Sequence, residues 1–472
     1  MSSTITTKVP ARLDRLPWSR WHWRIVIGLG TVWILDGLEV TIVGNLSGQL
    51  AKPGSGLDIT QAQVAGPAAA LYVAGACLGA LFFGWLTDRY GRKKLFIITL
   101  LVYLVATLAT AFSFSAWWFF LFRFITGFGI GGEYAAINSA IDELIPSRHR
   151  GRVDILINGS YWLGAAGGAL LTVPLLNDLP VAIGWRIAFG LGVVLGLAIL
   201  LVRRSVPESP RWLFIHGRDR QAEDIVAGIE REVGGDLPEP GESMTIHQRR
   251  SIGFVRIAHT MVALYPKRTI LGLSLFIGQA FLYNAITFGY AQILATFFKI
   301  DTQAGYYFAV IAIGNFLGPL LLGPLFDTVG RIPMISATYI GSGALLLGTA
   351  WLFAQGHLTA VTLTICWSVV LFVASAGASS AYLTVSEIFP METRALAIAF
   401  FFAIGTAAGG IAGPLIFSSL VSTGVPGDTA LAFAIGACVM ILAGLVELFL
   451  GVKAERKGLE AIAAPLSAAG PG

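Results

Sequence analysis

The chain has 472 residues, of which 55% are hydrophobic and only 12% are charged. Soluble domains carry about 25% charged residues. This composition therefore excludes a water-soluble globular protein, because it has too few polar residues to form the surface of one. The formal net charge is +5. Positive charge on a membrane protein is attracted to anionic lipid headgroups, and we therefore predict no nucleic-acid partner from it.

Twelve apolar runs are long enough to cross a bilayer as helices, which pair their own backbone groups within one segment. Taken in chain order, they are expected at 24–47, 64–86, 95–115, 117–142, 153–175, 184–202, 269–298, 303–326, 332–354, 358–387, 395–421 and 427–451. The sequence thus predicts an all-α membrane protein of twelve transmembrane helices in two six-helix bundles.

These runs divide the chain into five expected parts. They are an N-terminal segment 1–23, a first bundle 24–202, a linker 203–268, a second bundle 269–452 and a tail 453–472. Within the linker, 219–233 is expected to form a short amphipathic helix, because its apolar residues recur at helical spacing.

Basic residues predict the orientation, since Lys and Arg gather in cytoplasmic loops. With the N-terminus inside, all but four of the 32 Lys and Arg lie on the inner side; Lys52, Arg186 and Lys299 lie outside, and Arg123 lies within a helix. Both termini are therefore expected in the cytoplasm. The short outer loops point to a bacterial inner membrane.

Two motifs recur between the halves. The segment GWLTDRYGR at 84–92 matches GPLFDTVGR at 323–331, and the Glu, Pro and Arg of 143–150 match those of 387–394, at offsets of 239 and 244 residues. The chain is therefore interpreted as a duplicated six-helix unit.

Parallel repeats of this kind hold a substrate site near the midplane between the halves. Ion pairs that form and break at their helix ends are expected to act as a conformational gate. The residues assigned to this gate are Gly84, Asp88, Arg89, Gly91, Arg92, Glu143, Arg150, Asp327, Gly330, Arg331, Glu387 and Arg394.

The segments GWLTDRYGRKK, RFITGFGIGGEY and PESPRWL resemble the major facilitator superfamily. More narrowly, they resemble the sugar-porter and related metabolite:proton symporter families, over about residues 24–460. The resemblance implies two pseudo-symmetric bundles and secondary active transport by alternating access. It favours proton-coupled symport of a small polar metabolite, sugar or polyol-like.

Inserting an ionisable side chain at the depth of the bilayer centre costs about 2.5–3.5 kcal/mol, so such residues usually have a function. The first half holds Asp36, Glu39, Arg123 and Glu133, whereas no charge is expected in mid-helix in the second half. Asp36 and Arg123 are expected at comparable depth, which predicts an ion pair between them. By resemblance to proton-coupled sugar porters, Asp36 is the proton carrier and Arg123 its modulator. A purely structural ion pair is the alternative, and Glu39 and Glu133 either extend the proton path or face water.

Neutral polar and aromatic residues gather at midplane depth in both halves. Amides, hydroxyls and aromatic rings suit a polyol or a small ring compound, although hydrogen bonding between helices is the alternative for each residue. The candidate substrate ligands are Tyr161, Trp162, Gln279, Tyr283, Asn284, Asn315 and Tyr382. Gln279 and Asn284 match the helix-seven motif of sugar porters, whereas Gly278 and Gly289 depart from it.

The run Asp36-Gly37-Leu38-Glu39 also resembles the D-G-x-[DE] pattern of aromatic-acid:proton symporters. An aromatic or nicotinate-like carboxylate is therefore an alternative substrate, with Arg123 as its counter-ion. Efflux of a drug or metabolite is a second alternative, and a membrane enzyme is the non-transport one. The six scattered histidines and the lack of a Walker motif predict no enzyme, no metal and no cofactor. The expected partners are a small-molecule substrate, protons and the lipid bilayer, and the chain is expected to work as a monomer.

Overall fold

The computed structural model describes residues 4–60, 63–203, 207–234, 237–240, 243–247, 259–300, 303–390 and 394–463. Helices of the first half are α2 (Arg20–Leu50), the π-helical turn η1 (Val64–Ala68), α4 (Ala69–Tyr90), α5 (Arg92–Ala111), α6 (Ala116–Leu144), α7 (Ser147–Gly159), α8 (Tyr161–Asn177) and α9 (Val181–Arg203). Those of the second half are η2 (Thr260–Leu264), α13 (Pro266–Phe298), α14 (Ala304–Thr328), α15 (Arg331–Ala354), α16 (Ala360–Ile388), α17 (Arg394–Ser422) and α18 (Pro426–Leu450). Most of the apolar runs found in the sequence thus correspond to one helix each, whereas 64–86 covers η1 and α4, and 153–175 covers α7 and α8. The run 95–115 extends past the end of α5 at Ala111.

Nine helices in the described part of the chain are long and apolar enough to cross a membrane. Their outward faces expose large apolar side chains, among them Val105, Leu321 and Phe449. A helix that is apolar on all sides belongs in a protein core or in hydrocarbon, which confirms the predicted membrane protein.

The run 153–175 is divided into α7 and α8 at Ser160. The Ser160 hydroxyl donates to the carbonyl of Ile157 at 2.6 Å and also lies 3.1 Å from the carbonyl of Gly30. Beside this break, a Cβ atom on Gly159 would lie only 2.4 Å from the ring of Pro319 in α14. The absence of a side chain at Gly159 therefore allows a helix of the second half to approach closely.

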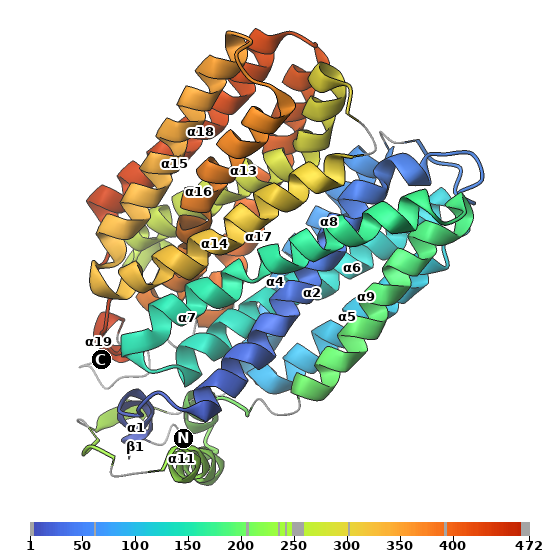
Figure 1. Ribbon diagram of the computed structural model, residues 1–472. Helices are drawn as coiled ribbons and strands as arrows, with labels where there is room; N and C mark the ends of the chain where they lie inside the picture. Colours follow the sequence, from blue (N-terminus) through green and yellow to red (C-terminus); the bar gives the residue numbers. More distant parts are fainter. Residues whose placement is uncertain are drawn as a thin grey trace.

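The two halves lie side by side, blue to green and yellow to red in Figure 1. Between them, α4 packs against α17, and α14 packs against both α7 and α8. Both termini lie at one end of the molecule, together with α1, α11 and α19 (Figure 1). We call this end the terminal face.

Small elements outside the bundles build the terminal face. They are β1 (Thr4–Thr7), α1 (Val9–Asp14), α10 (Pro210–Ile215), α11 (Asp219–Val233), β2 (Met244–His247) and α19 (Leu459–Ile462). The predicted amphipathic helix is α11, which buries Ala222, Val226 and Ile229. An antiparallel pairing of β1 with β2, with Thr4 opposite His247, was not predicted.

Candidate functional site

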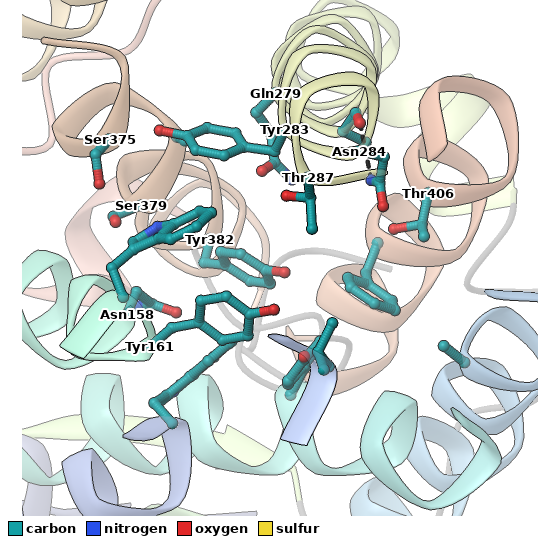
Figure 2. A pocket seen from close by; sticks show the side chains of 18 of the residues that line it. Asn158, Tyr161, Gln279, Tyr283, Asn284, Thr287, Ser375, Ser379, Tyr382 and Thr406 are labelled. Carbon is teal, nitrogen blue, oxygen red and sulfur yellow. Dashed lines mark hydrogen bonds between the residues drawn. The ribbon is translucent and has the colours of Figure 1, made fainter. Parts of the chain in front are cut away.

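A cavity of about 170 Å³ lies between the two halves (Figure 2). It is lined from α2, α4, α6, α7 and α8 on one side and from α13, α16 and α17 on the other. The polar residues that line it are Asn158, Gln279, Asn284, Thr287, Ser375, Ser379 and Thr406, and the aromatic ones are Trp33, Tyr72, Tyr134, Tyr161, Trp162, Tyr283, Tyr382 and Phe402. All of these lining side chains are neutral.

Aromatic rings from both halves meet at this cavity. Trp33 stacks on Tyr134 with ring centroids 4.4 Å apart and planes 11° apart, and Tyr382 approaches Trp33 edge-on at 5.9 Å. Trp162 of the first half lies 5.2 Å from Tyr283 of the second. Aromatic faces of this kind stack favourably on a flat ring. The cavity thus offers flat apolar surfaces on both of its walls.

The polar groups complement these rings. Asn284 donates its Nδ2 to the carbonyl of Ala280 at 2.8 Å, which fixes the orientation of its amide. Tyr161 and Tyr382 project into the same cavity from opposite halves (Figure 2). Hydroxyl groups can donate and accept hydrogen bonds, so these walls can bind either a carboxylate or a hydroxyl-bearing ligand.

Six of the seven predicted substrate ligands line this cavity, and Asn315 does not. Asn315 is fully buried in α14, where its Oδ1 accepts a hydrogen bond from the Tyr283 hydroxyl at 3.1 Å. Its Nδ2 donates a hydrogen bond to the carbonyl of Ile311 at 3.3 Å. Asn315 therefore supports Tyr283 from behind the cavity wall in this conformation.

Several lining residues were missed in the sequence. Asn158 lies four residues before Trp162, on the same face of the α7–α8 pair, and this spacing was the available signal. Trp33 lies one turn before Asp36 on α2. Ser375 and Thr406 carried no signal, because isolated Ser and Thr are common in apolar helices, where they bond to their own backbone.

Arg123 and Glu39 form a buried ion pair in the first half, with Nη2 and Oε1 3.0 Å apart. The same Nη2 lies within hydrogen-bonding distance of the Thr110 and Thr126 hydroxyls, at 3.2 and 3.1 Å. Thr107 donates to Glu39 Oε1 at 3.0 Å. The ring of Phe189 lies 4.9 Å from the guanidinium carbon.

This pair corrects the expectation that Asp36 would be the ion-pair partner of Arg123. Glu39 lies one helical turn farther from the terminal face than Asp36, about 4.5 Å along α2. Arg123 lies in the first turns of α6, which begins at the opposite end of the molecule. Glu39 is therefore nearer in depth, and its longer side chain spans the remaining gap. Asp36 is fully buried one turn away, and Glu133 is fully buried in α6.

Two further buried carboxyl groups were not expected. Asp154 is fully buried in α7, one turn from Asn158 toward the terminal face. Glu447 is 1% exposed near the end of α18, and neither of its carboxyl oxygens has a hydrogen-bond partner among the described residues. Glu447 thus adds a buried acidic group to the second half, at the end of a helix and not in mid-helix.

The duplicated motifs meet at the terminal face. Asp327 of α14 accepts hydrogen bonds from the backbone N–H groups of Gly151 and Arg152 in α7, at 3.2 and 2.8 Å. Arg331 pairs with Asp327 at 3.0 Å and with both oxygens of Glu387 at 3.0 Å. Asp327 thus joins the second half to the start of a first-half helix.

The first copy of the motifs repeats this geometry. Arg92 pairs with Glu143 at 3.0 Å, as Arg331 does with Glu387. Gly91 and Gly330 both adopt positive φ, at 102° and 118°, at the corresponding helix starts. Between the halves, Arg150 lies 3.8 Å from Glu387.

The remaining predicted gate residues behave differently. Arg89 places its guanidinium over the rings of Trp85 and Tyr90, within its own helix, and Gly84 is buried in α4. The side chains of Asp88 and Arg394 lie outside the described part of the structure.

Residues 51–465 match the family model described as "Sugar (and other) transporter". The chain belongs to this family of the major facilitator superfamily. Over 454 residues it is 27% identical to the niacin transporter NiaP of Acinetobacter baylyi, which covers 96% of this chain and 99% of the relative. It is 26% identical to the 4-hydroxybenzoate transporter PcaK of the same organism, over 84% of each chain.

The fold matches the proton:xylose symporter XylE bound to 6-bromo-6-deoxy-D-glucose. The TM-score is 0.76 at 19% identity, with 94% of this chain and 99% of that chain covered. Membership of the family confirms the predicted fold of two six-helix bundles. It also confirms that the protein is a membrane transporter and not an enzyme.

Proposed function

We propose that the protein is a proton-coupled symporter of a small aromatic carboxylate, with a single ring of nicotinate or hydroxybenzoate size. The observation that carries this proposal is the aromatic lining of the cavity. Trp33, Tyr134 and Trp162 of the first half and Tyr283 and Tyr382 of the second half present aromatic faces to it. Such faces suit a flat ring better than a puckered sugar. The likeness to NiaP and PcaK supports the same substrate class.

No cationic side chain is among the described residues that line the cavity, so a carboxylate would be bound by neutral donors or carried with a proton. Donors are present in the Gln279 amide and in the hydroxyls of Tyr161 and Tyr382. Arg123 does not line the cavity and is engaged with Glu39. The proposal therefore replaces the expected Arg123 counter-ion with neutral donors.

A sugar or polyol is the second candidate. It is supported by the amides and hydroxyls of Asn158, Gln279, Asn284 and Ser379, which match a ligand with several hydroxyl groups. The family description includes sugar transporters. Competition between the two ligand classes separates the candidates.

Proton coupling is assigned to Asp36, Glu39 and Arg123. Protonation of a carboxyl group beside Arg123 would weaken the ion pair, and the substrate-loaded protein could then change conformation. Opening toward the terminal face requires the Asp327 and Glu387 contacts to break, as in alternating access. The terminal face is assigned to the cytoplasm of a bacterial inner membrane, on the strength of its basic residues.

Uptake into proteoliposomes with an imposed pH gradient tests the proposal. We expect labelled nicotinate or 4-hydroxybenzoate to accumulate, and a protonophore to abolish the accumulation. Inhibition by xylose and inositol but not by aromatic carboxylates would select the polyol candidate. Equilibration without accumulation would refute coupling, and gradient-driven transport in the opposite direction would indicate efflux. Asp36→Asn is expected to lose accumulation while it retains counterflow exchange.

A further inference from the structure

The first residues of the chain form a folded strap across the terminal face. We define the N-terminal strap as residues 4–16, which include β1 and α1. Its apolar side chains Val9, Leu13 and Leu16 are at most 2% exposed. Because burial of such side chains contributes about 1.5–3 kcal/mol each, this strap is docked as part of the fold.

Charged groups fasten the strap to the linker helix α11. Arg12 donates to both carboxyl oxygens of Glu230, at 3.0 and 2.6 Å, and also pairs with Glu223. Arg15 pairs with Glu230 at 2.6 Å. The strap is therefore attached to the linker helix α11, on the N-terminal side of the first membrane helix.

Asp14, at the end of α1, connects the strap to the transport helices. Its Oδ1 accepts a hydrogen bond from the backbone N–H of Ser147, the first residue of α7, at 3.2 Å, and lies 3.5 Å from Arg150 Nη2. Its Oδ2 lies 3.6 Å from Arg211 in α10. A carboxylate at a helix N-terminus is stabilised by the helix dipole, which reinforces this position.

Arg150 is shared between the strap and the second half. While Nη2 faces Asp14, Nη1 lies 3.8 Å from Glu387 Oε1 and 3.4 Å from the carbonyl of Lys457. Arg150 is fully buried, so its charge must be compensated wherever it lies. Asp14 and Glu387 together provide that compensation from opposite sides of the gate.

We propose that Asp14 is a positioning residue of the gate at the terminal face, and that the N-terminal strap holds Arg150 against Glu387 while this face is closed. The strap thereby stabilises the closed state through a residue that none of the duplicated motifs contains. This inference does not depend on which substrate the cavity binds.

Distance measurement between spin labels tests this inference without a substrate. Labels at Lys94→Cys and Thr328→Cys, both exposed, would report the separation of the halves at the terminal face in nanodiscs. Cys77, Cys366 and Cys438 would first be replaced by Ser. Asp14→Asn keeps an oxygen acceptor for the Ser147 N–H group but removes the charge. We expect it to raise the population of the open form about fivefold, the effect of losing a partly buried ion pair.

Two comparisons distinguish gating from general destabilisation. Glu232→Gln removes the ion pair of Glu232 with Arg24, in which neither Asp14 nor Arg150 takes part, and it should leave the distances unchanged. Asp14→Glu keeps the charge and should restore the distribution of label distances that is typical of the closed form.

Arg150→Gln should open this face at least as much as Asp14→Asn, because it also removes the contact with Glu387. The double variant should open no further than Arg150→Gln, because Asp14 acts on the gate through Arg150. An unaltered distance distribution in folded Asp14→Asn would overturn the proposal. If Asp14→Asn does not fold, Arg12→Gln takes its place, because it weakens the attachment of the strap to α11 and leaves Arg150 and Glu387 unchanged. Opening in Arg12→Gln supports the proposal, and no opening there overturns it. Full additivity in the double variant would also overturn it.

Discussion

Arg123 bonds to Glu39 and not to Asp36, although both acidic residues lie on the same helix three positions apart. Both members of the pair are at most 2% exposed. Glu39 Oε2 and Arg123 Nε have no hydrogen-bond partner within the described residues. The pair is therefore incompletely satisfied, and a change of protonation nearby can readily alter it.

Glu39→Gln is expected to destabilise the protein by about 3–5 kcal/mol, because it leaves the buried Arg123 cation without its partner. Thermal unfolding of the purified protein in detergent measures this change. Removing both charges with Glu39→Gln and Arg123→Met should recover most of the loss. Unchanged stability in Glu39→Gln would show that the pair does not persist in the membrane.

The hydrogen bond from Tyr283 to Asn315 is expected to set the shape of the cavity wall. Asn315→Ala leaves the Tyr283 hydroxyl unsatisfied, at a cost of about 1–3 kcal/mol. Because Tyr283 packs on Trp162, the ring would move and substrate affinity should fall. Ligand quenching of tryptophan fluorescence measures this affinity. Tyr283→Phe combined with Asn315→Leu should reduce substrate affinity by less than the sum of the two single changes. Strict additivity would argue against a role for the hydrogen bond between Tyr283 and Asn315.

Gly159→Ala is expected to disturb the contact between the halves. The added Cβ would meet the Pro319 ring at 2.4 Å, and overpacking of this kind costs about 1–3 kcal/mol. We expect slower transport and lower thermal stability. Gly167→Ala is the matched control, since nothing lies within 4 Å of its Cβ position. Equal behaviour of the two variants would exclude a specific role for Gly159.

The attachment of the N-terminal strap is expected to depend on pH. Hydrogen bonding to Arg12 lowers the pKa of Glu230 below its usual value, with Arg15 adding to the effect and burial opposing it. Since the pKa is lower in the folded state, the stabilisation is present above the unfolded value of about 4.3 and is lost as the pH falls below it.

Hydrogen–deuterium exchange of residues 8–16 tests this dependence. We expect protection that is constant from neutral pH to about pH 5 and declines below about pH 4. Glu230→Gln should exchange faster at neutral pH and lose most of the pH dependence. Protection that rises on acidification would contradict the assignment.

The sequence alone determined the helices of this protein and the duplication of its two halves. Apolar runs of membrane-spanning length must satisfy their own backbone hydrogen bonds, so composition along the chain is sufficient to locate the long apolar helices, although not the break between α7 and α8. The motifs around Arg92 and Arg331 revealed the duplication because their Gly, Asp and Arg residues keep the same spacing, although most of the residues between them differ. Even the linker helix α11 followed from local periodicity.

Only the tertiary structure decided which side chains meet. Asn315 and Tyr283 both appeared as cavity residues, yet one lies behind the other, since the orientation of a side chain depends on how its helix is rotated against its neighbours. The choice of Glu39 over Asp36 by Arg123 depended on differences in depth of a few ångströms. Hydropathy specifies helix boundaries only to within a turn, so such pairings are set by packing between helices distant in the chain.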